Sequence, residues 1–219
     1  MLLKAMENAD YPMRAPVFIL KKPLLLASAS PRRQRLLASI GIDCPAHPAA
    51  IDESRRPSES GENYVRRLAE AKAQAVAESF PESFVLAADT AVCQGRQVLG
   101  KPSSPQEAER TLASLAGKTH RVLTGYYLTQ KTTQLNIAGC VASRVRFAAW
   151  DTDTLSAYAS CGEPLDKAGA YGIQGAGAFL AASISGSSTN VIGLPLAEIV
   201  SLFLSLGIIV PATSVVRKI

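Results

Sequence analysis

Two continuous apolar runs place the strongest limit on how this chain can fold. Residues 23–27 read Pro-Leu-Leu-Leu-Ala, and residues 84–88 read Phe-Val-Leu-Ala-Ala. A strand that is apolar at every position is buried on both faces, as in sheets that are covered by helices on both sides. A helical pattern follows the first run, with Ser30 as a suitable N-cap and Pro31 at the first helical position. We therefore expect an α/β fold.

The clearest predicted helix covers residues 62–80. Polar side chains recur every four residues along one stripe, whereas Val65, Leu68 and Val76 lie on the opposite face. Lys72 falls on that apolar face, where a charge is costly unless it has a partner. Other predicted elements are helices over 31–40, 105–116, 152–161 and 194–206, strands over 22–29, 84–88, 97–99, 121–129, 141–150 and 179–184, and a glycine-rich loop over 169–177. Helices and strands alternate until a long hairpin intervenes, which predicts a mixed sheet.

The length of the chain, 219 residues, suits one large domain or two small lobes. Residues 1–22 lack the apolar core of a signal peptide, so we expect an N-terminal extension of unknown role and a fold that begins near Pro23. No apolar run reaches the roughly 18 residues of a membrane span. Four widely spaced cysteines are interpreted as small buried thiols in a reducing cytosol. A cytoplasmic protein without a membrane segment is expected.

The charge balance is mildly basic. Lys and Arg number 23 and Asp and Glu number 18, which gives a net charge of +5. This balance suits an anionic ligand. The basic residues are scattered, and no RNA-binding motif is present, so nucleic acid is not an expected partner.

The segment that joins the first strand to the first helix suggests an anion site. It reads Ser28-Ala29-Ser30-Pro31-Arg32-Arg33, so two guanidinium groups follow two hydroxyls in the first helical turn. Free N–H groups and the helix dipole make this end of a helix positive, and acids would stabilise it better than arginines. A bound anion would explain the two arginines. The alternative is an ordinary N-cap followed by two surface arginines.

Asp89 and Thr90 follow the second apolar run directly. The carboxyl ends of strands in open α/β sheets form the ligand crevice, and a carboxylate there can bind a divalent cation or act as a base on water. The alternative is a capping aspartate. Residues 95–101 approach the phosphate-loop pattern, but Pro102 replaces the hydroxyl that would bind the metal. Lys101 could still contact phosphate as a single charge.

The glycine-rich loop carries Gln174, an amide that suits the edge of a small planar ligand. A structural turn is an equally good interpretation of this loop alone. Together, the helix N-terminus and four cations offer phosphate contacts, and two carboxylates offer metal ligands. The four cations are Arg32, Arg33, Lys72 and Lys101, and the two carboxylates are Glu53 and Asp89. The residues alone indicate an enzyme that acts on a phosphate ester or anhydride.

Five motifs in order resemble the Maf-like nucleotide pyrophosphatases, once called septum-formation inhibitors. They are Leu25–Arg33, Ala88–Thr90, Leu99–Pro102, Glu163–Gly175 and Val191–Pro195. The resemblance implies a Maf/ITPase-like fold, in which an elongated, twisted mixed sheet is flanked by helices and two lobes enclose an active-site cleft. It also implies one catalytic domain over residues 23–210, followed by a tail over 211–219. The implied reaction is metal-dependent hydrolysis of a nucleoside triphosphate to the monophosphate and pyrophosphate, with Mg²⁺ or Mn²⁺, by a cytoplasmic homodimer that cleans the nucleotide pool.

The resemblance also implies roles for individual residues. Asp89 is similar in position to the catalytic base, and Asp89 and Glu53 to the metal ligands. The implied phosphate ligands are Ser28, Ser30, Arg33, Lys72 and Lys101. Arg32, Thr90 and Gln174 resemble the subgroup that prefers dTTP, UTP and related pyrimidine nucleotides. A second subgroup, with Trp, Gln and Glu at these positions, prefers 7-methylguanosine triphosphate and remains an alternative. The other alternative is a non-enzymatic regulator of septum formation.

Overall fold

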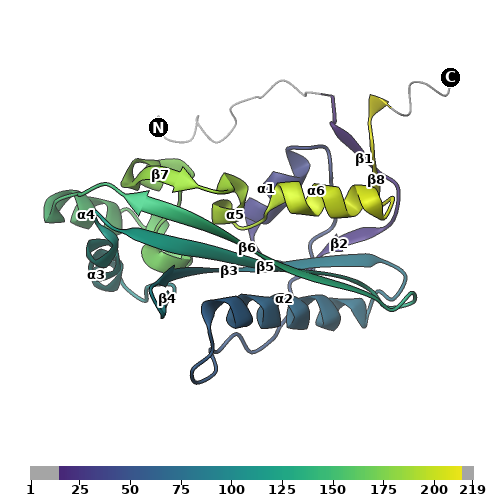
Figure 1. Cartoon of the computed structure of the whole chain (residues 1–219), viewed down its shortest axis with the longest axis horizontal. Coiled ribbons are helices and arrows are strands. Elements are labelled where there is room, and N and C mark those ends of the chain that lie inside the picture. Colours follow the sequence, from purple (N-terminus) through teal and green to yellow (C-terminus); the bar gives the residue numbers. More distant parts are fainter. Residues whose placement is uncertain (1–14, 214–219) are drawn as a thin grey trace.

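The computed structural model describes residues 15–213. Its main sheet has the strand order β2–β3–β5–β6–β7, with β4 paired to β3. The strands are β2 (Leu24–Leu26), β3 (Phe84–Gln94), β4 (Gln97–Leu99), β5 (Thr119–Gln130), β6 (Leu135–Phe147) and β7 (Ala181–Ser185). β2 and β3 are parallel, and the other neighbours are antiparallel. The expected mixed sheet is confirmed, and its three long strands form an elongated, twisted ribbon (Figure 1).

Helices lie on both sides of this sheet (Figure 1). They are α1 (Pro31–Ala38), α2 (Gly61–Ala77), α3 (Pro105–Leu115), α4 (Thr152–Ala159), α5 (Ser188–Ile192) and α6 (Leu196–Ser205), with short 3₁₀ turns η1 (Glu163–Asp166), η2 (Ala168–Ala170) and η3 (Gly175–Leu180). The short helix α5 was not predicted. Within residues 15–213, none of the helices has the length and apolar character that a membrane crossing needs.

The helix α2 packs against β3 and β5 along its apolar stripe. Val65, Leu68 and Val76 are buried there, as the sequence pattern predicted. Gly125 in β5 makes the close approach possible, because a Cβ atom at this position would lie 2.6 Å from the Val65 carbonyl group. The helix therefore covers the face of the sheet on which Asp89 lies opposite Gly125.

Two hydrophobic cores occupy opposite ends of the ribbon. One joins β2, α1 and α6 and includes Leu26, Leu37 and Phe203. The other joins α3, α4 and the end of β6 and includes Leu112 and Phe147. The long strands β3 and β5 run from one core to the other (Figure 1). This arrangement matches the expected pair of lobes.

The ends of the described chain differ from the predicted boundaries. β1 (Phe18–Leu20) pairs antiparallel with β8 (Ile209–Pro211), and Phe18 and Leu20 pack against the first core. Part of the predicted extension over 1–22, and the first residue of the predicted tail over 211–219, therefore belong to a second, two-stranded sheet. The apolar run Val17–Leu20 was too short to be recognised as a strand. Residues 1–14 and 214–219 lie outside the described residues.

The four cysteines are all free, but they are not uniformly buried. Cys93 is buried, Cys44 and Cys140 are half-buried, and Cys161 is exposed just after α4. The expectation of four buried thiols was therefore wrong for Cys161, which follows the last turn of an amphipathic helix and points to solvent.

Candidate functional site

Asp89 lies in the middle of β3, beside an opening in the edge of the sheet. β2 pairs with residues 84–86, and β4 pairs with residues 92–94. On that side of β3, residues 87–91 have neither β2 nor β4 as a partner. The prediction that Asp89 ends a strand was wrong, because β3 continues to Gln94. The gap between β2 and β4 forms the crevice instead.

A cleft of about 510 Å³ opens at this gap. All the residues that the sequence analysis selected line it: Ser28, Ser30, Arg32, Arg33, Glu53, Lys72, Asp89, Thr90, Lys101 and Gln174. They come from the β2–α1 connection, the first turn of α1, the segment before α2, α2 itself, β3, the segment after β4 and the glycine-rich loop. The fold thus brings together cations and carboxylates that lie far apart in the sequence.

Lys72 joins the two carboxylates of the cleft. Its Nζ atom donates to Asp89 Oδ1 at 2.6 Å and lies 2.8 Å from Glu53 Oε1. Lys72 and Asp89 are each 8% exposed, whereas the Glu53 side chain is half exposed. Burial raises the pKa of the Glu53 carboxyl, but the bond and charge of Lys72, with smaller effects from Lys101 and Arg33, leave that pKa below its usual value. Both carboxylates are thus held beside a buried cation.

The connection from β2 to α1 presents donors to the cleft. The Ser28 hydroxyl accepts hydrogen bonds from the Ser30 N–H group at 3.2 Å and from Arg33 Nη1 at 3.0 Å. Both of its lone pairs are then occupied, so its remaining capacity is to donate its hydrogen, which suits an anion. Ser30 occupies the N-cap position as predicted, but within residues 15–213 its side chain makes no capping bond. Its hydroxyl is therefore also available to a ligand.

Arg33 is a buried cation that is fixed by protein atoms. It is 9% exposed, and its guanidinium group donates to Gly193 O at 2.8 Å, to Ser28 Oγ and to Thr90 Oγ1 at 3.1 Å. Burial lowers the pKa of Arg33, and the charge of Asp89 opposes this effect. Arg33 nevertheless stays charged, because an arginine pKa lies far above neutrality. Its remaining N–H groups can bind a phosphate.

Arg32, Lys101 and Gln174 lie around the more open parts of the cleft. Arg32 Nη1 donates to Asp166 Oδ2 at 3.0 Å, which connects α1 to η1. Gln174 is exposed at the start of η3. Lys101 is also exposed, and its charge acts on Glu53. These three side chains therefore border the same cleft without direct contact between them among the hydrogen bonds of the described residues.

Sequence reasoning assigned no role to several residues that line the cleft. They are Tyr64, Asp166, Lys167 and Tyr171. Three of them belong to the stretch 163–175, whose motif was recognised but whose only assigned residue was Gln174. Glu163 organises this stretch, because its carboxylate accepts from the Ala176 N–H group at 2.9 Å and from the Tyr158 hydroxyl at 3.2 Å. Tyr64 had no sequence signal beyond its place on a helix.

The carboxylates of Asp89 and Glu53 fit a divalent cation whose remaining ligands would come from the substrate and from water. Within residues 15–213, His, Cys, Asp and Glu side chains form no group of three or more that could hold a metal ion. Asp89 and Glu53 instead meet at one ammonium group, which shows that the position between them accepts positive charge. Mg²⁺ often binds through one or two carboxylates, with phosphate oxygens and water completing its shell. The donor set matches that mode.

The fold and the cleft together define an α/β protein whose cleft is lined by Arg32, Arg33, Lys72 and Lys101, of which Arg33 and Lys72 are buried. The chain belongs to the family described as Maf-like protein, whose sequence model matches residues 23–206.

Individual relatives extend this result. A "dTTP/UTP pyrophosphatase" of Myxococcus xanthus is 48% identical over 86% of this chain and 94% of its own length. A protein of the same name from Desulfotalea psychrophila is 43% identical over 86% of this chain and 96% of its own length. Among solved structures, the Staphylococcus aureus Ham1 protein has a TM-score of 0.43 at 14% identity, over 58% of this chain and 73% of that one.

Proposed function

We propose that this chain hydrolyses dTTP and UTP, and related modified pyrimidine nucleotides, to the nucleoside monophosphate and pyrophosphate. One observation carries the proposal. Asp89, its partner Lys72 and the phosphate-binding candidates share one cleft with Arg32, Thr90 and Gln174, in a chain 48% identical to a protein named "dTTP/UTP pyrophosphatase". The proposed setting is the cytoplasm, where a homodimer would remove unwanted nucleotides from the pool, with no nucleic-acid partner.

The proposed reaction uses Asp89 as the base. A water molecule gives a proton to the Asp89 carboxylate while the water oxygen attacks the α-phosphorus. The bond between the α-phosphorus and the oxygen that bridges it to the β-phosphorus breaks, and pyrophosphate leaves with the bonding electrons. Lys72 Nζ donates to Asp89 Oδ1 at 2.6 Å and thereby orients this carboxylate. Arg33, Ser28 and Ser30, together with Lys101, would stabilise the negative charge on the phosphates.

A divalent cation, Mg²⁺ or Mn²⁺, is proposed as the cofactor. Asp89 and Glu53 would hold it, and when bound it would neutralise charge on the phosphate oxygens. Glu53 suits this role because its carboxyl is half exposed and remains ionised beside Lys72.

Gln174 is the proposed reader of the nucleobase. An amide can donate to a carbonyl group and accept from the N3–H group of uracil or thymine. Arg32 and Thr90 are the other proposed specificity residues. Hydrolysis of 7-methylguanosine triphosphate and a non-enzymatic role in septum formation remain the competing functions.

A substrate panel tests the proposal. The chain is incubated with Mg²⁺ or Mn²⁺ and dTTP, UTP, CTP, 7-methylguanosine triphosphate or the standard purine triphosphates, and pyrophosphate and orthophosphate are quantified separately. We expect pyrophosphate from dTTP and UTP, and loss of turnover after chelation of the metal. Pyrophosphate from the methylated guanine nucleotide alone would reject the pyrimidine assignment, and no turnover of any nucleotide would favour the regulatory function.

The first variant to test is Asp89→Asn. Loss of the base should lower kcat by about 100-fold or more. The variant should lose some stability but still fold, because asparagine can accept from Lys72 and the Glu53 carboxylate still pairs with it. Asp153→Asn, an exposed aspartate in the first turn of α4, is the matched control and should keep wild-type kcat. If Asp89→Asn retained turnover within a few-fold of the wild type, Asp89 would not be the base.

A further inference from the structure

The Arg33 guanidinium group is the first member of a chain of hydrogen bonds that runs away from the cleft. Arg33 Nη2 lies 3.1 Å from Thr90 Oγ1, and Thr90 Oγ1 lies 2.9 Å from Thr124 Oγ1. Thr124 Oγ1 in turn donates to the backbone carbonyl of Asn190 in α5 at 2.9 Å. Thr124 is fully buried in β5, and the phosphate-binding assignments give it no role.

The direction of every bond in this chain is determined. A carbonyl oxygen can only accept, so Thr124 must give its single hydroxyl hydrogen to Asn190. Thr124 therefore has only lone pairs to offer to Thr90, and Thr90 must donate to Thr124. Thr90 is then left with lone pairs, one of which accepts from Arg33. The sequence of donation is Arg33 to Thr90, Thr90 to Thr124, and Thr124 to Asn190.

This direction limits what Thr90 can do in the cleft. The only hydrogen of the Thr90 hydroxyl is directed to Thr124. Thr90 therefore cannot donate to a nucleobase carbonyl group while these hydrogen bonds are in place. Its contact with Arg33 instead fixes the guanidinium group. Arg33 Nε also donates to the Gly193 carbonyl, just after α5, so the middle of α5 and the residue that follows it are both connected to the same arginine.

We propose that Thr124 is a positioning residue that holds Arg33 in its anion-binding orientation, and that Thr90 acts on the substrate through Arg33 rather than by contact with the base. The inference rests on the proposed function only in that Arg33 binds phosphate. A larger side chain at position 90 would interrupt this series of hydrogen bonds and displace the Arg33 guanidinium group. The proposed effect of Thr90 on nucleotide specificity would follow from that displacement.

The test compares two substitutions of Thr124. Thr124→Val keeps the shape of the side chain but removes the hydroxyl, whereas Thr124→Ser retains it. Thr129→Val is the matched control, because Thr129 is also a buried threonine of β5 that makes one side-chain bond, to Asn136, outside the cleft lining. Urea unfolding of each variant establishes that it is folded before it is assayed.

Two readouts are measured: KM and kcat for dTTP, and the Kd of inorganic pyrophosphate from calorimetry. For Thr124→Val we expect a rise of about tenfold in KM and in the Kd of pyrophosphate, with kcat within about threefold of wild type. Thr124→Ser should restore both values to within about twofold, and Thr129→Val should leave them unchanged. An unaltered Kd in Thr124→Val, or equal loss in the valine and serine variants, would overturn the role of Thr124.

Thr90→Val separates action through Arg33 from contact with the base. The proposal expects the Kd of pyrophosphate, which has no base, to rise by the same factor as in Thr124→Val, and the double variant to be no worse than either single one. A change in the preference between dTTP and 7-methylguanosine triphosphate without any change in the Kd of pyrophosphate would overturn the proposal. A wild-type protein that binds no pyrophosphate would also overturn the proposal. Absence of turnover with intact pyrophosphate binding would reject the proposed function alone.

Discussion

Lys72 is a cation in a core position, and its two carboxylate neighbours come from opposite directions along the chain. Asp89 follows it by 17 positions on β3, and Glu53 precedes it in the segment before α2. A buried ammonium group without a partner would cost several kcal/mol of folding free energy. The partners that offset this cost are the two carboxylates proposed for catalysis, so stability and chemistry depend on the same contacts.

His120 is a buried ionisable group outside the lining of the cleft, and it packs against the second core. It is 2% exposed, its ring packs edge-on against Phe147 and Tyr171, and its Nε2 atom lies 2.7 Å from the Tyr171 hydroxyl. Burial lowers the pKa of His120 from 6.5 to about 4. The folded chain therefore keeps this imidazole neutral in mildly acidic solution.

The stability of the protein should fall as the pH falls from about 6.5 to about 4. Within this window the unfolded chain binds a proton at His120 and the folded chain does not, which favours unfolding. The loss due to this residue is about 3 kcal/mol at the lower limit. Urea unfolding at neutral and acidic pH measures it. His120→Gln can still bond to Tyr171 but cannot titrate, and should show a correspondingly smaller loss.

His47→Gln is the control for this experiment, because His47 is the other histidine of the chain. It should keep the wild-type dependence on pH. If wild type and His120→Gln lost equal stability on acidification, His120 would not be the group responsible.

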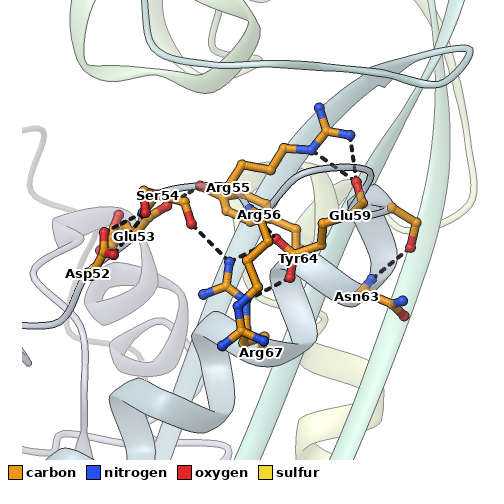
Figure 2. Close-up of polar contacts among 10 residues, drawn as sticks. Asp52, Glu53, Ser54, Arg55, Arg56, Glu59, Asn63, Tyr64 and Arg67 are labelled. Atoms are coloured by element: carbon orange, nitrogen blue, oxygen red, sulfur yellow. Dashed lines mark hydrogen bonds and ion pairs between the residues drawn. The ribbon is translucent and has the colours of Figure 1, made fainter.

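At the scale of elements, the segment that carries Glu53 is held by the first two turns of α2 (Figure 2). The Tyr64 hydroxyl donates to the Glu53 carbonyl at 3.0 Å, and Arg67 Nη2 donates to the Ser54 carbonyl at 3.0 Å. Arg67 also makes two bonds to the Glu59 carboxylate, at 2.7 and 2.8 Å. The bond from Arg67 lowers the pKa of Glu59 to about 2. The same helix thus supplies Lys72 and fixes the segment that brings Glu53 to it.

Replacement of Arg67 should release this segment. In Arg67→Met we expect the apparent affinity for Mg²⁺ to fall by about 10-fold or more, because a group that orients the proposed metal ligand Glu53 is lost. Titration of activity with Mg²⁺ at saturating dTTP measures it. Arg66→Met is the matched control, since Arg66 is the neighbouring arginine but pairs with exposed Glu62 on the helix surface. Equal Mg²⁺ dependence in the two variants would show that Arg67 does not position Glu53.

The sequence predicted elements well where local signals decide them. The start of α3 has a capping serine, Ser104, which is a recognisable signal in the sequence. Ser104 Oγ accepts from the Glu107 N–H group, and the Glu107 carboxylate accepts from the Ser103 N–H group. The extent of β3 could not be predicted in this way. Asp89 looks like the end of a strand because it breaks an apolar run, whereas pairing with β5 over nine positions continues the strand past it.

The candidate site was predictable in its residue types but not in its contacts. Paired arginines at a helix start and a carboxylate after an apolar run carry chemical meaning in the sequence alone. Thr124 does not, because a threonine in an apolar strand is an ordinary strand residue. Its importance comes from the pairing that places it opposite Thr90 and beside α5.

At the scale of the whole molecule, each lobe has its own core, and the cleft lies between them. The first core is completed by residues from the two ends of the described chain, since Phe18 from β1 and Ile209 from β8 both pack into it. The cleft lining does not include either strand. A substitution in this two-stranded sheet should therefore lower the free energy of unfolding without lowering kcat/KM.

Ile209→Ala provides the corresponding measurement. Ile209 is 1% exposed, so its truncation should lower the free energy of unfolding by about 2–4 kcal/mol, whereas kcat/KM for dTTP at low temperature should stay near wild type. Val210→Ala, which alters the half-buried neighbour on the same strand, should cost less than about 1 kcal/mol. A loss of kcat/KM as large as that of a cleft variant would mean that the two regions are coupled.

The pairing of β1 with β8 also sets an order of events during synthesis. β1 precedes all the other described elements and β8 follows them, so β1 leaves the ribosome long before its partner strand is made. Until then the first core lacks the buried residues of α6 and β8, which are Ile199, Phe203 and Ile209. The first lobe is therefore completed late, whereas the second core, whose buried residues run from Val92 to Leu180, can close before α6 and β8 are made.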